Sequence, residues 1–252
     1  MKLTILGCGT STGVPVIACH CAVCSSTEKK NRRTRSSLLI REGGKNILID
    51  TSTDLRAQSL ANGLERVDAV LFTHPHADHI HGIDDLRAFN LAQGGAIPCY
   101  GSAGTIARVR LIFDYIFTDN SNDGWKPNLA TETVDGPFEA AGVNVTPVAI
   151  RHGVAEIFGY RVGNAAYLTD CSAIPPGSAG LIKGVDVLIL GALRHKPHPT
   201  HFTIAQAIEA SRETGAKRTI LTHLSHNIDY ARDNELLPEG VELAYDGMVV
   251  EA

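Results

Sequence analysis

His74–His79 reads His-Pro-His-Ala-Asp-His, a hexapeptide that holds four potential metal ligands. The apolar run Val67–Phe72 lies shortly before it and is typical of a buried strand. Because side chains alternate sides in an extended segment, His74 and His76 are expected to point the same way. Packing alone needs no such concentration of ligand side chains, so this stretch predicts a metal site.

The second half of the hexapeptide is expected to begin a helix that continues through Ile80–Phe89. A turn at that point can direct Asp78 and His79 toward a second ion. Imidazole and carboxylate ligands on one loop suit zinc, manganese or iron. Two such sets close together therefore predict a dinuclear site.

The composition is that of a globular protein with a full core. Of the 252 residues, 44% are apolar and 20% are charged, which excludes a disordered-type chain. No linker or low-complexity segment interrupts residues 1–252, so we expect one large domain. The formal net charge of -4 argues against a broadly basic surface, so nucleic acid is not the expected partner.

The sequence predicts neither a membrane span nor secretion. No apolar stretch approaches the roughly 20 residues that a transmembrane helix needs. The apolar run in Met1–Leu6 is too short for a signal peptide. The six cysteines are not spaced like a secreted disulfide framework, so we expect a reducing cytoplasm.

Strand and helix patterns are mixed along the chain, which implies one α/β domain of layered sheets. Strands are expected at Leu3–Leu6, Ser37–Ile40, Asn46–Ile49, Val67–Phe72, Ile97–Tyr100, Val143–Ile150, Ile157–Val162, Ala165–Leu168, Val185–Leu190 and Arg218–Leu221. Helices are expected at Asp54–Asn62, Ile80–Phe89, Thr105–Tyr115 and Thr203–Thr214. The polar stretch Thr118–Asn128, with the only Trp at Trp125, is either a substrate-facing loop or an ordinary surface connection.

Three further potential ligands follow apolar strands later in the chain. His152, Asp170 and His223 each come two residues after the end of an expected strand. Strand ends that open on one rim of a sheet gather functional groups on a rigid frame. Alone, each residue could be a packed histidine or a loop cap. Together with the hexapeptide, they predict one site.

The seven ligands divide between two ions, with manganese or zinc as the expected metals. One ion is assigned to His74, His76 and His152, the other to Asp78, His79 and His223, and Asp170 bridges them. A water between two such cations becomes acidic enough to attack near neutral pH, which indicates hydrolysis. Asp50, also at a strand end, is predicted to orient a ligand histidine; a plain turn residue is the alternative.

These residues resemble the signature of the metallo-β-lactamase fold superfamily, and the likeness extends along nearly the whole chain. The resemblance implies a four-layer αββα sandwich with both ions at one edge of the sheets. Flavodiiron oxidoreductases of that superfamily carry a Glu where this chain has Ala77, so hydrolysis is favoured over redox chemistry. The loop Gly7–Pro15 resembles the phosphodiesterase branch, which is shared with transfer-RNA 3′-processing endonucleases.

Cys19, Cys21 and Cys24 form a second candidate site. Three thiols this close offer zinc an incomplete ligand set, and His226 is the natural fourth ligand. Redox-active or simply buried cysteines are the alternative. The arrangement resembles the phosphoribosyl 1,2-cyclic phosphate phosphodiesterases of the carbon–phosphorus lyase pathway, in which such residues hold a structural zinc. A homodimer is an expectation from this resemblance only.

The predicted reaction is hydrolysis of a small phosphodiester. A cyclic one, such as a phosphoribosyl cyclic phosphate or a cyclic nucleotide, is the leading substrate. Asp170 would help to hold the attacking group. His201, which matches a histidine of the resembling enzymes, would protonate the leaving alkoxide. His195 and His198 are weaker candidates for that proton donor.

Other functions use the same ligands. A transfer-RNA 3′-processing-type nuclease would need a basic face, and Lys29–Arg35 contains the only basic cluster. Lactone or thioester hydrolysis uses the same metal core, which does not exclude it. A non-catalytic metal-binding module would not require seven ligands around an open bridging position.

Overall fold

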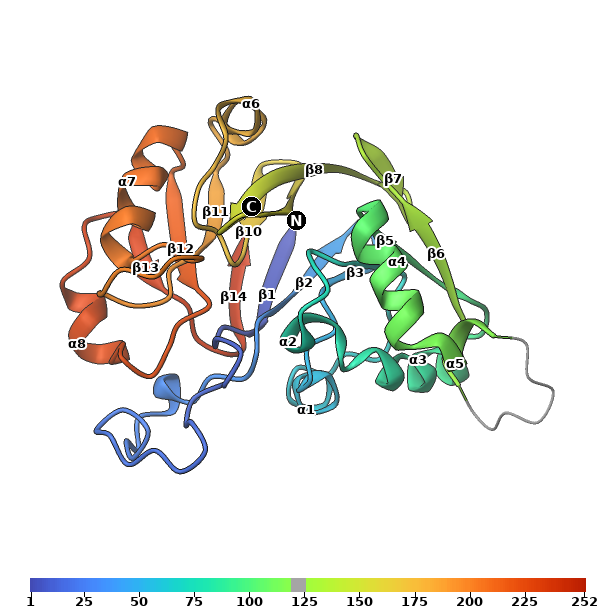
Figure 1. Cartoon of the computed structure of the whole chain (residues 1–252), viewed down its shortest axis with the longest axis horizontal. Coiled ribbons are helices and arrows are strands. Elements are labelled where there is room, and N and C mark those ends of the chain that lie inside the picture. Colours follow the sequence, from blue (N-terminus) through green and yellow to red (C-terminus); the bar gives the residue numbers. More distant parts are fainter. Residues whose placement is uncertain (119–125) are drawn as a thin grey trace.

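The computed structural model describes residues 1–118 and 126–252, and their strands form two seven-stranded sheets. The sheets pack face to face, and helices cover the outer face of each (Figure 1). These layers confirm the predicted four-layer αββα sandwich. Within the described ranges, no helix has both the length and the apolar character needed to span a bilayer.

The first sheet has the strand order β14-β1-β2-β3-β4-β5-β6. Its strands are β1 (Lys2–Gly7), β2 (Ser37–Glu42), β3 (Lys45–Ile49), β4 (Ala69–Leu71), β5 (Ile97–Gly101), β6 (Leu129–Thr133) and β14 (Met248–Glu251). On the same side of the molecule lie α1 (Leu55–Ala61), α2 (Ala77–Ile80), α3 (Leu86–Gln93), α4 (Ala103–Ile112) and α5 (Asp114–Phe117). Strands β3 to β6 run parallel, which places their carboxyl ends at one edge.

The second sheet has the strand order β13-β12-β11-β10-β9-β8-β7. Its strands are β7 (Phe138–Ala140), β8 (Val143–His152), β9 (Ala155–Val162), β10 (Ala165–Leu168), β11 (Val187–Gly191), β12 (Arg218–Thr222) and β13 (Val241–Leu243). Its helices are α6 (Pro176–Ala179), α7 (Ile204–Thr214) and α8 (Tyr230–Glu235). Short 3₁₀ turns occur at Lys29–Asn31, Ile83–Asp85 and Gly180–Ile182.

Both faces of each sheet are buried, which explains why central strands are apolar on both sides. Leu3 and Ile5 of β1 belong to the core between the sheets, whereas Leu6 belongs to the core under the helices of the first sheet. On the other side of the molecule, Ile204 and Ala207 of α7 pack in one cluster with residues of the second sheet. Central strands therefore form a rigid frame whose ends can hold side chains in place.

Each strand predicted from the sequence is present, with ends that differ by no more than two residues. Four further strands, β6, β7, β13 and β14, and the helices α6 and α8 were not predicted. The helices predicted at Asp54–Asn62 and Thr203–Thr214 are confirmed as α1 and α7. The predicted loop at Thr118–Asn128 includes Trp125 and lies largely outside the described residues, so its substrate-facing role stays a prediction.

Two predictions of a single continuous helix were wrong, because each segment is divided into shorter helices. The segment predicted as a helix over Ile80–Phe89 consists of α2, a 3₁₀ turn and α3. Gly82 interrupts it, because its backbone packs directly on the loop that follows β3 and its N–H donates to the Thr51 carbonyl oxygen at 2.9 Å. The helix predicted at Thr105–Tyr115 ends at Ile112, and α5 follows separately after a non-helical residue.

Gly82→Ala is expected to lower the free energy of unfolding by about 1–3 kcal/mol, the usual cost of overpacking a well-filled interior. A Cβ at this position would overlap the Ser52 carbonyl oxygen. Gly104→Ala in α4 is the control, because a Cβ there meets open space. Urea unfolding curves of the two variants would measure the difference. Equal stabilities would show that the loop beside Gly82 yields without cost.

Candidate metal centre

The predicted ligands meet at one edge of the two sheets. The hexapeptide joins β4 to α2, His152 ends β8, and Asp170 and His223 come just after β10 and β12. His152, Asp170 and His223 thus lie at the ends of strands, whereas Asp78 and His79 lie in α2. The frame of the sandwich, and not local sequence, brings them together.

The first group of donors contains His74, His76, His152 and Asp170, whose ligand atoms all lie within 4.8 Å of one another. Nε2 of His74 is 3.0 Å from Nδ1 of His76 and 3.8 Å from Oδ2 of Asp170. Nδ1 of His152 donates to the Thr200 carbonyl oxygen at 2.8 Å. This bond leaves Nε2 of His152 free to act as a ligand.

The second group contains Asp78, His79, Asp170 and His223, again within 4.8 Å of one another. Nε2 of His79 is 3.2 Å from Oδ2 of Asp78 and 3.2 Å from Oδ1 of Asp170. Nδ1 of His223 is 3.2 Å from the same Asp170 oxygen. All four residues are buried. The Asp170 carboxylate therefore faces both groups, with one oxygen toward each.

The donors fit divalent cations on two grounds. Oδ2 of Asp78 and Nε2 of His79 are buried and lie 3.2 Å apart, yet neither makes a well-aligned hydrogen bond in the described part of the chain. Buried polar atoms are rarely left in that state. Imidazole nitrogens and carboxylate oxygens are also the ligands that zinc and manganese accept. Six residues around the shared Asp170 carboxylate can hold two ions.

Charge pairing dominates the electrostatics of the second group. Burial would lower the pKa of His79, but Asp170, Asp78 and Asp50 outweigh it and hold that pKa well above its usual value. Burial would likewise raise the pKa of Asp170, yet His223 and His79 hold it well below its usual range. The carboxylates of this group are therefore ionised, and positive charge must balance them.

Asp50 lies directly behind His79. Its Oδ2 atom is 2.7 Å from Nδ1 of His79 and also accepts a hydrogen bond from the Thr73 hydroxyl at 2.8 Å. Its Oδ1 atom accepts from the Thr73 N–H at 2.8 Å. These bonds fix the plane of the His79 ring and leave Nε2 directed at Asp78 and Asp170.

Three residues of the site adopt left-handed backbone conformations. The φ angles are 63° at Asp50, 55° at Asp170 and 57° at His223. Left-handed geometry costs a residue with a Cβ about 1–2 kcal/mol. Each of the three comes just after a strand of the frame, where the chain must turn sharply to place the side chain on the rim. The strain is thus concentrated at the ligand positions.

Sequence analysis did not identify the hydroxyl groups around the ligands. The Thr10 hydroxyl lies 3.2 Å from Nε2 of His223, and the Ser36 hydroxyl lies 3.2 Å from Nδ1 of the same ring. Thr73 contacts both Asp50 and His74. Its position next to the hexapeptide is the only signal in the sequence, because Ser and Thr are common in loops of every kind.

The thiols of Cys19, Cys21 and Cys24 surround His226. Nδ1 of His226 lies 3.3, 3.7 and 3.5 Å from their respective sulfur atoms. A tetrahedral zinc with bonds of about 2.0–2.3 Å separates its nitrogen and sulfur ligands by about 3.6 Å. Hydrogen bonding from the Cys24 N–H lowers the pKa of the Cys21 thiol to about 7, whereas burial raises the pKa of Cys24 to about 11. The four residues fit a structural zinc.

His201 lies beside both ligand groups. Its ring centroid is 4.7 Å from that of His152 and 5.0 Å from that of His223, and its Nδ1 atom is 4.0 Å from Oδ2 of Asp170. Burial and His223 lower the pKa of His201 to about 3. His198 contacts the His201 ring, with centroids 5.0 Å apart, whereas His195 lies 3.4 Å from Asp233 at the surface.

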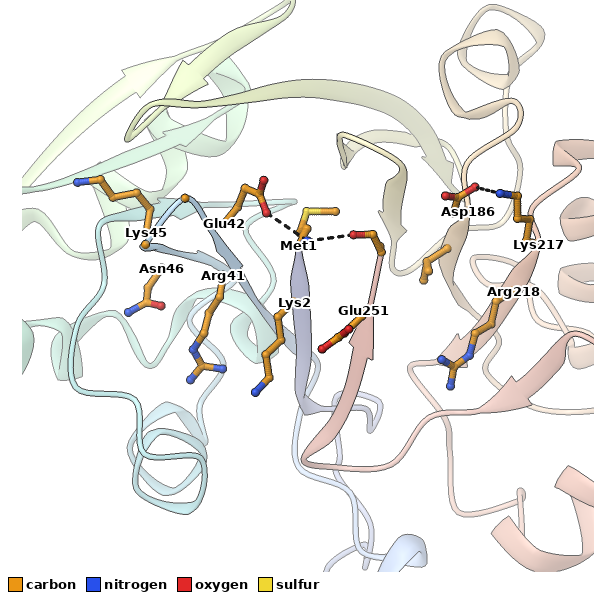
Figure 2. Close-up of a pocket in the computed structure, with 14 residues that line it drawn as sticks. Met1, Lys2, Arg41, Glu42, Lys45, Asn46, Asp186, Lys217, Arg218 and Glu251 are labelled. Atoms are coloured by element: carbon orange, nitrogen blue, oxygen red, sulfur yellow. Dashed lines mark hydrogen bonds and ion pairs between the residues drawn. The ribbon is translucent and has the colours of Figure 1, made fainter.

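A groove of about 820 Å³ lies elsewhere, around Met1 and Ala252 (Figure 2). Among the described residues that line it there is no histidine or cysteine. Strand β12 begins at this groove with Arg218 and ends just before His223, a span of roughly 16 Å for its five residues. The groove is therefore separate from the metal centre.

Comparison with known proteins agrees with this geometry. A family model described as the β-lactamase superfamily domain matches residues 45–224. The chain belongs to the metallo-β-lactamase superfamily. A crystal structure of a new diphosphatase from the PhnP family is 43% identical, with a TM-score of 0.93, and the match covers 100% of this chain and 97% of that one. These two matches support the prediction that the chain is a metal-dependent hydrolase.

Two other relatives mark the breadth of the superfamily. Zn²⁺-bound PqqB from Methylobacterium extorquens is 22% identical over 100% of both chains, with a TM-score of 0.81, and shows the fold alone. An octanoyltransferase from Porphyromonas gingivalis is 40% identical over 252 residues, which are 98% of this chain and 51% of that protein. The chain thus spans about half the length of that relative.

Asp50→Asn is expected to weaken binding of Zn²⁺ or Mn²⁺ by about 10- to 100-fold, the usual effect of losing the carboxylate behind a ligand histidine. An amide can still accept the Thr73 N–H bond, so the fold should survive. Titration of the metal-free protein would measure the affinity. Asp186→Asn, at the distant groove, is the control and should bind as the parent does. Equal affinity for both variants would contradict the role of Asp50.

Proposed function

We propose that the chain hydrolyses small phosphodiesters, with cyclic ones such as a phosphoribosyl cyclic phosphate or a cyclic nucleotide as the leading substrates. The observation that carries the proposal is the position of His201 beside a carboxylate shared by two ligand groups. A proton donor at that position suits the departure of an alkoxide. The 43% identity with a PhnP-family diphosphatase supports phosphorus–oxygen bond cleavage.

The ligand residues have distinct tasks in this proposal. His74, His76 and His152 would hold one cation, Asp78, His79 and His223 the other, and Asp170 both. Two divalent cations so bound would supply positive charge for the phosphoryl oxygens and lower the pKa of water. Asp50 and the Thr200 carbonyl fix the tautomers of His79 and His152. Cys19, Cys21, Cys24 and His226 would hold a structural zinc.

The chain's own groups account for the proton movements. Asp170, ionised because His223 and His79 lower its pKa, can accept a hydrogen bond from the attacking water. The attacking water loses one proton to solvent, and its oxygen forms a bond to phosphorus as the bond from phosphorus to the ester oxygen breaks. His201 gives the departing ester oxygen a proton and regains one from solvent. The pKa of His201, about 3, must rise for this step. A phosphate anion beside the ring raises it by Coulomb attraction.

The structure weakens the case for a nuclease, because the basic cluster at Lys29–Arg35 is not a free cationic face. Arg33 is 2% exposed. Arg35 pairs with Asp54 at 3.2 Å. Lys30 lies over the ring of Tyr230, 4.3 Å from its centroid. Few charges are left to contact a nucleic-acid backbone.

Cleavage of a diphosphate is the second candidate, because the 43%-identical relative is described as a diphosphatase. The same ligands and the same proton donor would serve both reactions. We assign the octanoyl transfer of the Porphyromonas relative to the half of that protein that this chain does not match.

A substrate screen tests the proposed function. Protein reconstituted with Mn²⁺ or Zn²⁺ would be incubated with a ribose cyclic phosphate, a cyclic nucleotide, a dinucleoside diphosphate, bis(p-nitrophenyl) phosphate, a lactone and a thioester. We expect turnover of the phosphate esters and none of the last two. Turnover of only the lactone or thioester would overturn the proposal, and salt-sensitive cleavage of a transfer-RNA precursor would revive the nuclease.

His201→Ala is expected to lower turnover of an alkyl phosphodiester by about 10²- to 10⁴-fold, because the leaving alkoxide loses its proton donor. Turnover of the p-nitrophenyl ester should fall far less, since p-nitrophenolate leaves without a proton. Cation content should match the parent protein. His195→Ala is the control, because His195 pairs with Asp233 at the surface. Unchanged turnover of the alkyl ester would remove His201 from the mechanism.

A further inference from the structure

One short segment carries a ligand from each of two separate groups. His223 belongs to the carboxylate-rich second group. His226 belongs to the cluster of Cys19, Cys21, Cys24 and His226, which is called the thiol group below. Only Leu224 and Ser225 separate them, and Leu224 is held by backbone bonds to Cys8 and Thr10. The positions of His226 and His223 therefore depend on the same short stretch of backbone.

The turn that follows holds His226 in place. The Ile228 N–H donates to the Ser225 carbonyl oxygen at 3.2 Å, so residues 225–228 form a closed turn with His226 inside it. The Arg33 guanidinium binds both ends of this turn. Its Nη1 donates to the Ser225 carbonyl oxygen at 3.0 Å, and its Nη2 donates to the Ile228 carbonyl oxygen at 2.9 Å.

Arg33 is itself firmly held. Nη2 also donates to Oδ1 of Asn31 at 3.1 Å, and this oxygen accepts the Tyr230 N–H at 2.8 Å. The backbone of Arg33 forms two bonds of 2.8 Å with Val14, in the loop that contains Thr10. Arg33 thus joins the N-terminal loop to the turn at residues 225–228.

The environment of Arg33 is costly for a cation. The side chain is 2% exposed, its Nε atom has no partner, and it makes no ion pair within the described ranges. Asp246, Asp229 and Asp233 attract this cation only without direct contact. A buried cation without a direct carboxylate partner is expensive, and an apolar side chain of similar size is commonly as stable. The planar guanidinium of arginine can bind two carbonyl oxygens at a fixed spacing, which an apolar side chain cannot do.

We propose that Arg33 is a positioning residue that couples the thiol group to the second ligand group. By fixing the turn at residues 225–228, it holds His226 toward the thiols and His223 toward Asp170. Loss of the guanidinium then weakens cation binding at His223 without removing any ligand. The inference rests on the proposed cation binding and is independent of which substrate is hydrolysed.

Cation titration of metal-free Arg33→Met tests the proposal. The affinity of one of the two Mn²⁺ or Zn²⁺ sites, the one that contains His223, should fall by about 10- to 100-fold, as for other residues that support a ligand. Binding to the first group, at His74, His76 and His152, should stay within about twofold. Arg33→Lys should give an intermediate loss. Arg41→Met is the matched control, because Arg41 lines the distant groove and its guanidinium donates to the Thr4 hydroxyl at 3.0 Å, away from both ligand groups.

A double-mutant comparison separates coupling from simple loss of structure. Cys21→Ser alone should weaken the same cation site, because the thiol group no longer holds His226. In the Arg33→Met background it should have little further effect. Losses that multiply in the double variant would overturn the coupling, as would unchanged affinity in Arg33→Met. If that variant does not fold, Arg33→Lys decides in the same way.

Failure of the proposed function gives a different result. If the parent protein binds no more than one cation outside the thiol group, the dinuclear site is wrong. If it binds two and hydrolyses none of the phosphate esters, the proposed substrate class is wrong, and the affinities of the Arg33 variants still test the coupling.

Discussion

The Asp170 carboxylate lies buried at the point where ligands from both sheets meet, and its charge must be balanced there. Leaving a carboxylate in an apolar interior without opposite charge costs several kcal/mol. Its two oxygens face His74 on one side and His79 and His223 on the other. On its other side, the His79 ring pairs in the same way with the Asp50 carboxylate. Balancing the charge of Asp170 thus requires the ends of β4, β10 and β12 and the loop after β3 to lie close together.

The sandwich can meet this requirement because its central strands are fixed from both faces. The core between the sheets and the two cores under the helices leave these strands no freedom to shift. A rigid frame can hold left-handed residues such as Asp50, Asp170 and His223, which a mobile loop would relax. Strain at the rim is therefore a consequence of where the strands end. The site needs the whole domain to form.

The sequence predicts this fold best where burial is greatest. Every central strand was predicted, while the four missed strands, β6, β7, β13 and β14, are the edges of the two sheets. Edge strands such as Leu129–Thr133 are largely exposed and carry little hydrophobic pattern. The break at Gly82 depends on a loop that lies 30 residues earlier, which local periodicity does not contain.

The clustering of the predicted ligand residues could be foreseen because such side chains are rare at strand ends, but the groups that support them could not. Thr10 and Ser36 have no distinctive pattern, and only the fold brings them to His223. From the sequence, Arg33 was only one member of the basic cluster Lys29–Arg35. In the structure Arg33 is buried against the turn at residues 225–228 and binds two of its carbonyl oxygens, so it does not serve as a surface charge. Such residues are found by their contacts alone.

The cysteine-bearing segment shows why the support of Arg33 matters for the metal centre. Between Thr10 and Glu28 no helix or strand forms, and the segment's own apolar cluster contains only Val14, Val23 and Cys24 as buried members. So small a core cannot order the chain. Its shape must come from the contacts of its thiols with His226 and from its base, where Arg33 binds the turn at residues 225–228 and Asn31 binds Tyr230. Because that turn continues directly from His223, order in this segment and geometry at the second ligand group depend on the same few bonds.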